Sequence, residues 1–427
     1  MPPGDRANVE HSDGSASGGT VVGGNRVLAE AAQPLIRLRL PNAPPKDNWE
    51  QVGEVMKELL SYLNAHTADI LADIERLVRL ESPSRDKAGL DRVQDVNQQW
   101  LSAFGRVSRR PTNTGDILHL QVEGATSARV LLLAHMDTVY PVGSWQDIWR
   151  VDGDKAFGPG AYDMKGGAVQ ALWALRALQE LRTKPAAAID LLLTSDEEIG
   201  SEASRPMIED LARAARAVLV LEAPHMSGDL KIARKGVGDY SITIHGKAAH
   251  QGIEPENGRN AIISAAHLIQ ELVTLQDLEK GTTVGPNVIH GGSASNVVAD
   301  RATLEVDVRI WDLAEGERLD AAIRAIKPLD GTRYEIGGGL NRPPMEPSEG
   351  TMQLLQTAQA LARELGFEVG AARVGGGSDG NFTSRLAPTL DGFGPVGAHA
   401  HQKDLEFIHV PSLAPRTALL AGMLVRR

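Results

Sequence analysis

Three adjacent carboxylates, Asp196, Glu197 and Glu198, follow the apolar run of residues 191–194 and are the residues best placed to do chemistry. Carboxylates side by side repel one another, so a cluster without a neighbouring Lys or Arg indicates a bound cation. A metal ion is the first candidate. A solvated acidic turn before a helix, where acidic residues favour the N-terminal dipole, explains the same residues without any function.

Two further groups occur at the ends of apolar segments. AHMDTV (134–139) places His135 and Asp137 on one face of a strand, so that the carboxylate accepts from one ring nitrogen while the other nitrogen binds a metal. A hydrogen-bonded histidine at a strand end is the alternative. GPGAYDMKGG (158–167) places Asp163 in a glycine-flanked turn before a helix, where a plain N-cap is also consistent with the residue.

The strand AVLVLEA (217–223) ends with Glu222, and GAHAHQKDLEFI (397–408) offers His399 and His401. Spacing does not choose between the two histidines. The first four groups all lie at the carboxyl ends of strands, which is the edge where open α/β sheets bind ligands.

The elements that must position these groups alternate between strands and helices, which predicts an α/β catalytic domain with a mostly parallel sheet and helices on both faces. Its expected ranges are residues 49–235 and 343–427. Between them, residues 236–342 read as an inserted α+β domain of the split βαβ type, with hinges near Lys235 and Arg342. Residues 1–48 read as a mobile N-terminal leader.

Composition limits the function further. The chain of 427 residues has a formal net charge of −11 and no cluster of basic residues, which argues against nucleic acid and anionic membranes as partners. It contains no cysteine, so a metal site must use His, Asp and Glu. No secretory signal or membrane-spanning segment is recognised, and we expect a cytoplasmic protein.

Taken together, AHMDTV, GPGAYDMKGG, SDEEIGS, LEAP and HQKDLEF resemble the co-catalytic zinc hydrolase family of carboxypeptidase G, the aminoacylases, acetylornithine deacetylase and succinyl-diaminopimelate desuccinylase. The resemblance runs from about residue 55 to the C-terminus. It implies two Zn²⁺ per chain, although Co²⁺ or Mn²⁺ would suit the same ligand types. The implied ligands are His135 and Glu222 for one ion, Glu198 and His401 for the other, and Asp163 between them.

The resemblance also implies roles in catalysis. Glu197 would be the general base that takes a proton from water and passes it to the departing amine, and Asp137 would orient His135. In the inserted lid and dimerisation domain, His250 would steady the oxyanion and Asn296 would contact the substrate. Arg342 would bind the substrate's free carboxylate through paired hydrogen bonds.

Within this family, RPP (342–344), GGGSDGN (375–381) and HQKDLEF resemble carboxypeptidase G in particular, and the resemblance makes GGGSDGN a glycine-rich wall of the substrate pocket. The expected activity is therefore release of C-terminal glutamate from N-acyl or peptidyl substrates. An N-acyl-amino-acid deacylase and a non-catalytic binding protein that keeps the fold are the alternatives. The sequence does not rank four cations, Lys231, Arg234, Lys235 and Arg309, as partners for an acidic side chain. The family resemblance further implies a homodimer.

Overall fold

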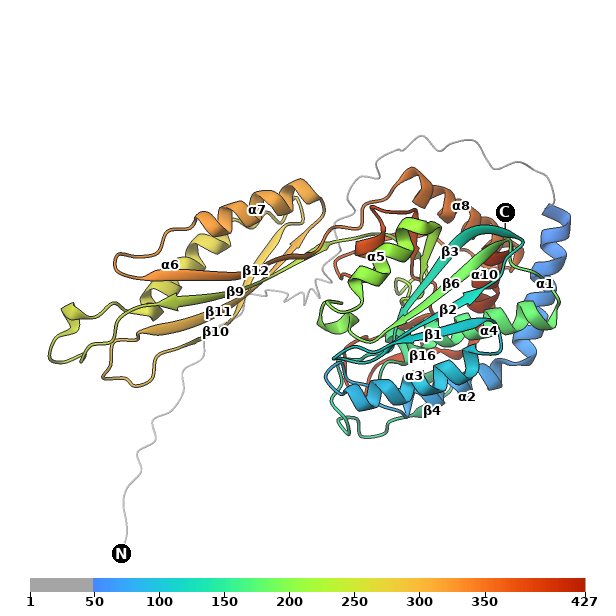
Figure 1. Cartoon of the computed structure of the whole chain (residues 1–427), viewed down its shortest axis with the longest axis horizontal. Coiled ribbons are helices and arrows are strands. Elements are labelled where there is room, and N and C mark those ends of the chain that lie inside the picture. The colour runs from blue at the N-terminus through green and yellow to red at the C-terminus, as the bar shows by residue number, and fades with distance from the viewer. Residues whose placement is uncertain (1–48, 427) are drawn as a thin grey trace, which may run out of the picture. The chain divides into compact units, whose positions relative to one another are not determined.

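The computed structural model describes residues 49–426 (Figure 1). The expected leader, residues 1–48, lies outside the described residues. Among residues 49–426, none of the helices has both the length and the apolar character that a membrane span requires.

An eight-stranded sheet is the centre of the structure, with the strand order β1-β2-β6-β3-β7-β14-β8-β13. The strands β6, β3, β7 and β14 run parallel, as do β8 and β13, while β1–β2, β2–β6 and β14–β8 are antiparallel pairs. The mostly parallel sheet of the sequence prediction is therefore confirmed. The bounds are β1 (Arg106–Arg110), β2 (Ile117–Val122), β3 (Thr126–His135), β6 (Ala187–Thr194), β7 (Ala215–Val220), β8 (Leu230–Arg234), β13 (Ala371–Val374) and β14 (Thr389–Asp391).

Alternating side chains of the central strand β3 enter two different cores. Leu132 and Ala134 pack in the core beneath α1, α2, α4, α8 and α10, whereas Leu131 and Leu133 pack beneath α5 and α9 on the other face. This double coverage explains why β3 reads as a continuous apolar run. The helix bounds are α1 (Trp49–Ala65), α2 (Thr67–Val78), α3 (Lys87–Leu101), α4 (Gly166–Glu180), α5 (Arg205–Ala214), α8 (Glu349–Glu364), α9 (Gly380–Thr383) and α10 (Leu413–Val425).

A small antiparallel sheet with the order β15-β16-β5-β4 was not predicted. Its strands are two or three residues long: β4 (Arg150–Asp152), β5 (Lys155–Phe157), β15 (Gly397–Ala398) and β16 (Phe407–His409). Phe157 and Phe407 pack against each other with Tyr140 and Trp145 in a separate apolar cluster. The sheet fixes both ends of the loop that carries His399 and His401.

Residues 236–342 form a second antiparallel sheet with the order β10-β11-β9-β12. The bounds are β9 (Gly236–His245), α6 (Ala261–Thr274), β10 (Thr283–Gly291), β11 (Arg301–Ile310), α7 (Leu313–Ala325) and β12 (Arg333–Arg342). Ile242, Leu304 and Val306 are buried under α6 and α7, and alternate residues such as Ser241 and Glu305 are exposed. The element order is the predicted one, and the division into separate domains stays a prediction.

Polar side chains cap the N-termini of several helices. Asp86 accepts from Gly89 N before α3, Asn260 accepts from Ile262 N and Ile263 N before α6, and Ser348 accepts from Thr351 N before α8. Each cap satisfies a backbone N–H that has no partner within its helix.

Candidate dinuclear metal site

His135 is the last residue of β3 and is fully buried. Its Nδ1 donates to the backbone carbonyl of Asp137 at 2.9 Å, which directs Nε2 towards two carboxylates. Nε2 lies 3.2 Å from Asp163 Oδ1 and 3.6 Å from Glu222 Oε1. The ring nitrogen and two carboxylates thus converge on one point at the carboxyl edge of the large sheet.

Asp163 lies between two sets of candidate ligands, one around His135 and one around His401. It lies in η1 (Ala161–Lys165), an irregular turn before α4, with an extended backbone at φ −123° and ψ 91°. Its Oδ1 faces His135, whereas its Oδ2 lies 3.3 Å from His401 Nε2. The same His401 nitrogen is 3.2 Å from Glu198 Oε1.

These separations fit metal binding by the residues present. His135, Asp163 and Glu198 each offer a ligand atom, and these atoms lie within 4.8 Å of one another. Two ligands at about 2.0–2.2 Å from one tetrahedral ion are about 3.3–3.6 Å apart, close to the 3.2–3.6 Å separations found here. Nitrogen and carboxylate oxygen are also the donors that zinc accepts when cysteine is absent.

The electrostatics agree with a site for cations. Hydrogen bonds to Asp163 and Glu198 raise the pKa of His401 to about 11. Burial alone would lower the pKa of His135, but its contacts with Asp137, Asp163 and Glu222 hold it well above the usual value. Both rings therefore lie in a strongly negative environment that favours positive charge.

Close backbone packing brings the turn of Asp163 against the sheet. A Cβ on Gly167 would lie 1.9 Å from the carbonyl oxygen of Leu221, so only glycine permits α4 to approach the end of β7. Gly160 precedes the turn in the left-handed region at φ 74°. Two of the four glycines of the GPGAYDMKGG motif, Gly160 and Gly167, are accounted for in this way.

Asp137 anchors the turn that carries the two glutamates, in addition to its predicted role beside His135. Its Oδ1 accepts from Glu197 N at 3.1 Å, and its Oδ2 accepts from Glu198 N at 3.0 Å and from Ser84 Oγ at 2.7 Å. The turn is η2 (Glu197–Ile199), directly after β6. With both amides fixed, the side chains of Glu197 and Glu198 diverge.

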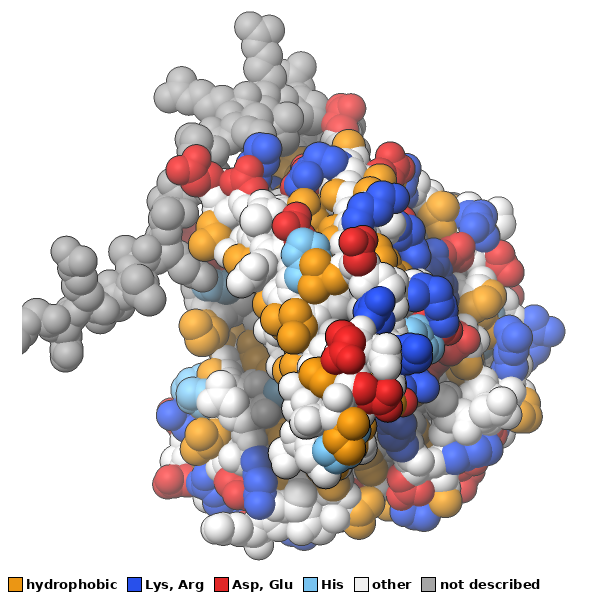
Figure 2. All heavy atoms as spheres, turned by 90° about the vertical axis from the view of Figure 1, so that its left-hand side faces the viewer, with side chains coloured by type: hydrophobic (Ala, Val, Ile, Leu, Met, Phe, Trp, Pro, Cys, Tyr) orange, Lys and Arg blue, Asp and Glu red, His pale blue; other side chains and the backbone are white. Residues whose placement is uncertain are grey.

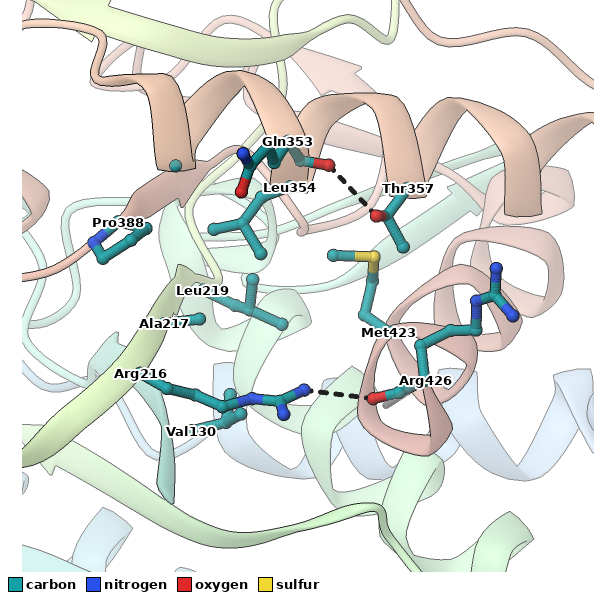
Figure 3. Close-up of a pocket in the computed structure, with 11 residues that line it drawn as sticks. Val130, Arg216, Ala217, Leu219, Gln353, Leu354, Thr357, Pro388, Met423 and Arg426 are labelled. Atoms are coloured by element: carbon teal, nitrogen blue, oxygen red, sulfur yellow. Dashed lines mark hydrogen bonds between the residues drawn. The ribbon is translucent and has the colours of Figure 1, made fainter. Parts of the chain in front are cut away.

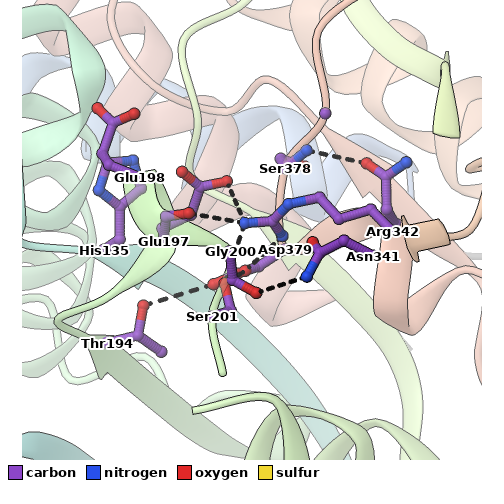
Figure 4. Close-up of polar contacts among 12 residues, drawn as sticks. His135, Thr194, Glu197, Glu198, Gly200, Ser201, Asn341, Arg342, Ser378 and Asp379 are labelled. Carbon is purple, nitrogen blue, oxygen red and sulfur yellow. Dashed lines mark hydrogen bonds and ion pairs between the residues drawn. The ribbon is translucent and has the colours of Figure 1, made fainter. Parts of the chain in front are cut away.

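Glu197 faces Arg342, and Figure 4 shows the Arg342 guanidinium between Glu197 and Asp379. Arg342 Nη2 is 3.0 Å from Glu197 Oε1 and also donates to the Glu197 carbonyl, while Nη1 donates to Asp379 Oδ1 at 2.8 Å. Burial raises the pKa of Glu197 well above its usual value, even though Arg342 opposes the rise. Arg342 thus forms an ion pair with Glu197, the predicted base. The role of Arg342 in substrate binding stays a prediction.

Two further buried acids, Asp379 and Glu406, have no role in the sequence predictions. Glu406 is buried and accepts from the backbone N–H groups of Tyr162 and Asp163 at 2.9 and 3.1 Å and from Tyr140 Oη at 2.7 Å. Burial raises the pKa of Glu406 to about 8. In the sequence, the motif GGGSDGN indicated Asp379 and the motif HQKDLEF indicated Glu406 as acidic residues near the site.

A cavity of 360 Å³ opens beside the carboxylates. Lys231 and Arg234 of β8 line it, together with Gly376 and Gly377 of the predicted glycine-rich wall. Arg234 pairs with Asp391 at 2.7 Å and lies 3.3 Å from Glu222. Lys231 is 8% exposed, and within residues 49–426 its ammonium has no hydrogen bond or ion pair.

Two of the other candidate residues lie elsewhere. Lys235 stacks over Trp311 and Arg309 pairs with Asp307, and neither lines the cavity. His399 does line the cavity, but its Nδ1 contacts Gln402 Oε1 instead of the carboxylates.

His250 and Asn296 are exposed neighbours in the 236–342 segment. His250 Nδ1 accepts from Gly252 N at 3.1 Å, and the Asn296 carbonyl accepts from Gln251 N at 2.9 Å. Neither residue lines the cavity, and their roles stay predictions.

Another cavity, of 260 Å³, lies near the start of β3 and β7 (Figure 3). Its lining includes Val130, Leu219, Leu354 and Met423, and Arg216 crosses it to donate to the backbone carbonyl of Arg426. No acidic or histidine side chain lines it, so it offers no metal ligands.

Comparisons with known proteins agree with this geometry. The sequence model of Peptidase family M20/M25/M40 matches residues 131–426. Carboxypeptidase G2 of Pseudomonas sp. is 30% identical over 83% of this chain and 88% of the relative, and a succinyl-diaminopimelate desuccinylase of Delftia acidovorans is 28% identical over 80% and 93%. An M20 family metallo-carboxypeptidase of Sulfolobus solfataricus has a similar fold, with a TM-score of 0.69 at 18% identity over 83% of this chain and 98% of that one.

Proposed function

Because the chain belongs to Peptidase family M20/M25/M40 and is a metal-dependent hydrolase, we propose that it releases C-terminal glutamate from N-acyl or peptidyl substrates through a dinuclear zinc site. The position of Asp163 supports the dinuclear part of this proposal, because its two oxygens face His135 and His401 separately. The similarity to carboxypeptidase G2 supports the glutamate part. His135 and Glu222 would hold one ion, Glu198 and His401 the other, with Asp163 shared. Cobalt or manganese would suit the same ligands.

Bound zinc ions would acidify a water molecule and polarise the amide carbonyl. Glu197 would take the proton of that water and return it to the departing amine. Its carboxylate is held at 3.0 Å by Arg342, and burial raises the pKa of this carboxyl well above its usual value, which is the direction that makes it a stronger base. Asp137 fixes the backbone of Glu197 and so keeps this carboxylate at one place.

Substrate contacts are proposed for five residues. On the family resemblance, His250 would steady the oxyanion, Asn296 would contact the substrate, and Arg342 would bind the α-carboxylate. Lys231 and Arg234 line the cavity beside Glu222, and the unpaired ammonium of Lys231 suits the side-chain carboxylate of glutamate.

A panel that holds the acyl group constant tests the glutamate preference. N-benzoyl derivatives of glutamate, alanine and lysine would be assayed with zinc-loaded protein. We expect kcat/KM for glutamate to exceed that for alanine by about tenfold or more, because a buried cation without its carboxylate is costly. Lys231→Met should abolish the difference, and Lys57→Met, on an exposed face of α1, should preserve it. Equal rates for glutamate and alanine would remove glutamate from the proposal.

The desuccinylase relatives favour a second candidate, an N-acyl-amino-acid deacylase. The glutamate carboxypeptidase would recognise the amino-acid side of the amide, whereas the deacylase would recognise its acyl side. N-succinyl-diaminopimelate hydrolysed faster than any N-acyl-glutamate would favour the deacylase. The relatives are named as enzymes, which argues against the non-catalytic alternative.

We also propose a homodimer through the 236–342 segment. Its edge strand β10 carries exposed Val288 and Ile289, and α6 carries exposed Ile262 and Ile263. Figure 2 views this segment and shows hydrophobic side chains interspersed with charged ones on its surface. An edge strand with apolar neighbours is suited to pairing with a second copy.

A further inference from the structure

Glu406 is a fully buried acid beside the candidate metal site, and it has no part in the proposed hydrolysis. Its Oε1 accepts from two backbone N–H groups, that of Tyr162 at 2.9 Å and that of Asp163 at 3.1 Å. Its Oε2 accepts from Tyr140 Oη at 2.7 Å. Both carboxylate oxygens are therefore engaged by donors from two other segments of the chain.

The turn that carries Asp163 is irregular. The backbone angles of Asp163 and Met164 lie outside the helical range, with ψ of 91° and 34°, so regular helical hydrogen bonds do not fix this part of the chain. The Asp163 carboxylate must nevertheless stay at one place, because its two oxygens face His135 and His401 separately. The two N–H contacts with Glu406 hold the backbone at this point.

Glu406 also belongs to the segment that carries His401. Glu406 N donates to Gln402 O at 3.1 Å, which closes a turn directly after His401. The next residue, Phe407, pairs with Phe157 between β16 and β5. The bond from Asp163 N to Glu406 therefore joins two ligand-bearing segments that are 243 positions apart.

The partner of Glu406 on its other side is itself held by packing. Tyr140 is 6% exposed, and its ring meets Trp145 edge-on with 5.3 Å between the ring centroids. Both rings belong to the apolar cluster that includes Phe157 and Phe407. A carboxylate with both oxygens engaged and a packed tyrosine as partner has little freedom to move, and it can position its other partners.

We propose that Glu406 is a positioning residue that fixes the Asp163 turn at the place where the Asp163 carboxylate can serve both ions. The proposal rests on the proposed metal site, but it does not depend on the identity of the substrate. Replacing a group that hydrogen-bonds to a metal ligand typically costs about 10–100-fold in metal affinity. Glu406 acts on Asp163 through the backbone amide, and we expect a loss of the same size.

Two variants separate the reach of the Glu406 side chain from its charge. Glu406→Gln keeps the length and an oxygen that can accept from both N–H groups, and its amide can donate to Tyr140 Oη. Glu406→Asp keeps the charge but is one methylene shorter, so it cannot reach both the turn and Tyr140. Asp190→Asn is the control for lost stability, because Asp190 is a buried acid of β6 whose contacts are with His119 and Arg129.

Zinc affinity would be measured without substrate, by competition with a chelator, at a temperature where circular dichroism shows every variant to be folded. We expect Glu406→Asp to raise the Kd of both ions by about 10–100-fold, since Asp163 is shared between them. Glu406→Gln and Asp190→Asn should stay within about threefold of the parent.

Retained zinc affinity in Glu406→Asp would overturn the proposal, and so would a loss in Glu406→Gln as large as that in Glu406→Asp. If Glu406→Asp does not fold, Tyr140→Phe decides, because it removes only the donor to Glu406 Oε2. The zinc Kd of Tyr140→Phe should then rise by about threefold or more, the size of one lost hydrogen bond. An unchanged Kd would overturn the proposal.

Failure of the proposed function appears in a different measurement. A parent chain that binds two zinc ions without hydrolysing any N-acyl-glutamate would remove the glutamate activity and leave the role of Glu406 to the affinity comparison. A parent that binds one ion would remove the dinuclear centre, and the Kd of that ion would be compared among the variants. A parent that binds no zinc would overturn both proposals.

Discussion

Glu197 and Glu198 are neighbours in sequence with different surroundings. Asp137 holds both amides, after which Glu197 turns to Arg342 and Glu198 turns to His401. Substituting each glutamate in turn separates the proposed base from the proposed ligand.

Glu197→Gln should lower kcat about 10²–10⁴-fold, because an amide cannot accept the proton. Metal content, measured by elemental analysis of the purified protein, should be unchanged. Glu202→Gln, at an exposed position of the same loop, is the control and should retain full activity. Near-normal turnover in Glu197→Gln would show that another group is the base.

Glu198→Gln should instead lose metal, since it removes one of the proposed charged ligands. The two variants therefore differ in metal content even where both lack activity. If Glu197→Gln lost metal and Glu198→Gln kept it, the proposed roles of base and metal ligand would have to be exchanged between the two glutamates.

Between elements, Arg342 joins the end of β12 to η2 and to Asp379 before α9. Removing a buried cation leaves Glu197 and Asp379 without a counter-charge. Arg342→Gln should lower the free energy of unfolding by about 3–5 kcal/mol, as measured by urea titration. Arg213→Gln, whose ion pairs are at the surface, should cost about 1 kcal/mol or less. Similar losses in both variants would contradict the structural importance of the Arg342 contacts.

Asp190 links three strands of the large sheet. It lies within β6, is 2% exposed, and contacts His119 of β2 at 2.6 Å and Arg129 of β3. Burial opposes ionisation, but these two partners outweigh it and lower the pKa of Asp190 to about 2.

Because the pKa of Asp190 is lower in the folded chain, its contribution is full above the unfolded value of about 3.9 and is lost as the pH falls towards 2. Asp190→Asn should therefore be less stable than the parent by about 2 kcal/mol or more at pH 7, with a difference that shrinks below about pH 4. Urea titrations at pH 7 and pH 3 measure it, with Asp210→Asn at an exposed helix position as control. A difference independent of pH would mean that packing, not ionisation, sets the effect.

The strand and helix order was predictable because long buried segments carry strong periodicity, as in β3, β6 and α4. The strand β1, with sequence RVSRR, carries three arginines and no apolar alternation, and the strands of the small sheet are too short for a periodic signal. His135, Asp163, Glu198 and Glu222 were predictable as polar residues at strand ends, whereas His401 was preferred over His399 only on the family resemblance. The contact of Arg342 with Asp379 was not, because only the fold brings these segments together.

At the scale of the whole molecule, the proposed ions would join segments from five parts of the chain. A ligand that binds only the folded state adds about 2.7 kcal/mol at 100 times its Kd. Chelation should therefore lower Tm by about 3 °C for one ion and about 6 °C for two in a chain of this size, as measured by scanning calorimetry. In Glu198→Gln the shift should be smaller. An unchanged Tm of the parent after complete metal removal would contradict a tightly held ion.

Ile263→Asp combined with Val288→Asp should yield monomers, because charges at the proposed interface cannot be buried without partners. Sedimentation velocity measures the change, with Val151→Asp as control. A parent chain that sediments as a monomer would remove the dimer from the proposal.

The distance along the chain between His135 and His401 has a consequence for biosynthesis. The hydrogen bond of Tyr140 to Glu406 likewise joins residues 266 positions apart. At about 5–20 residues per second, a ribosome needs about 15–50 s to travel that far. His135, Asp163 and Glu222 would have left the ribosome well before His401 is translated, so the two proposed ions become bindable at different times. The nascent chain must keep an acidic, half-built centre soluble until the segment that carries His401 is made.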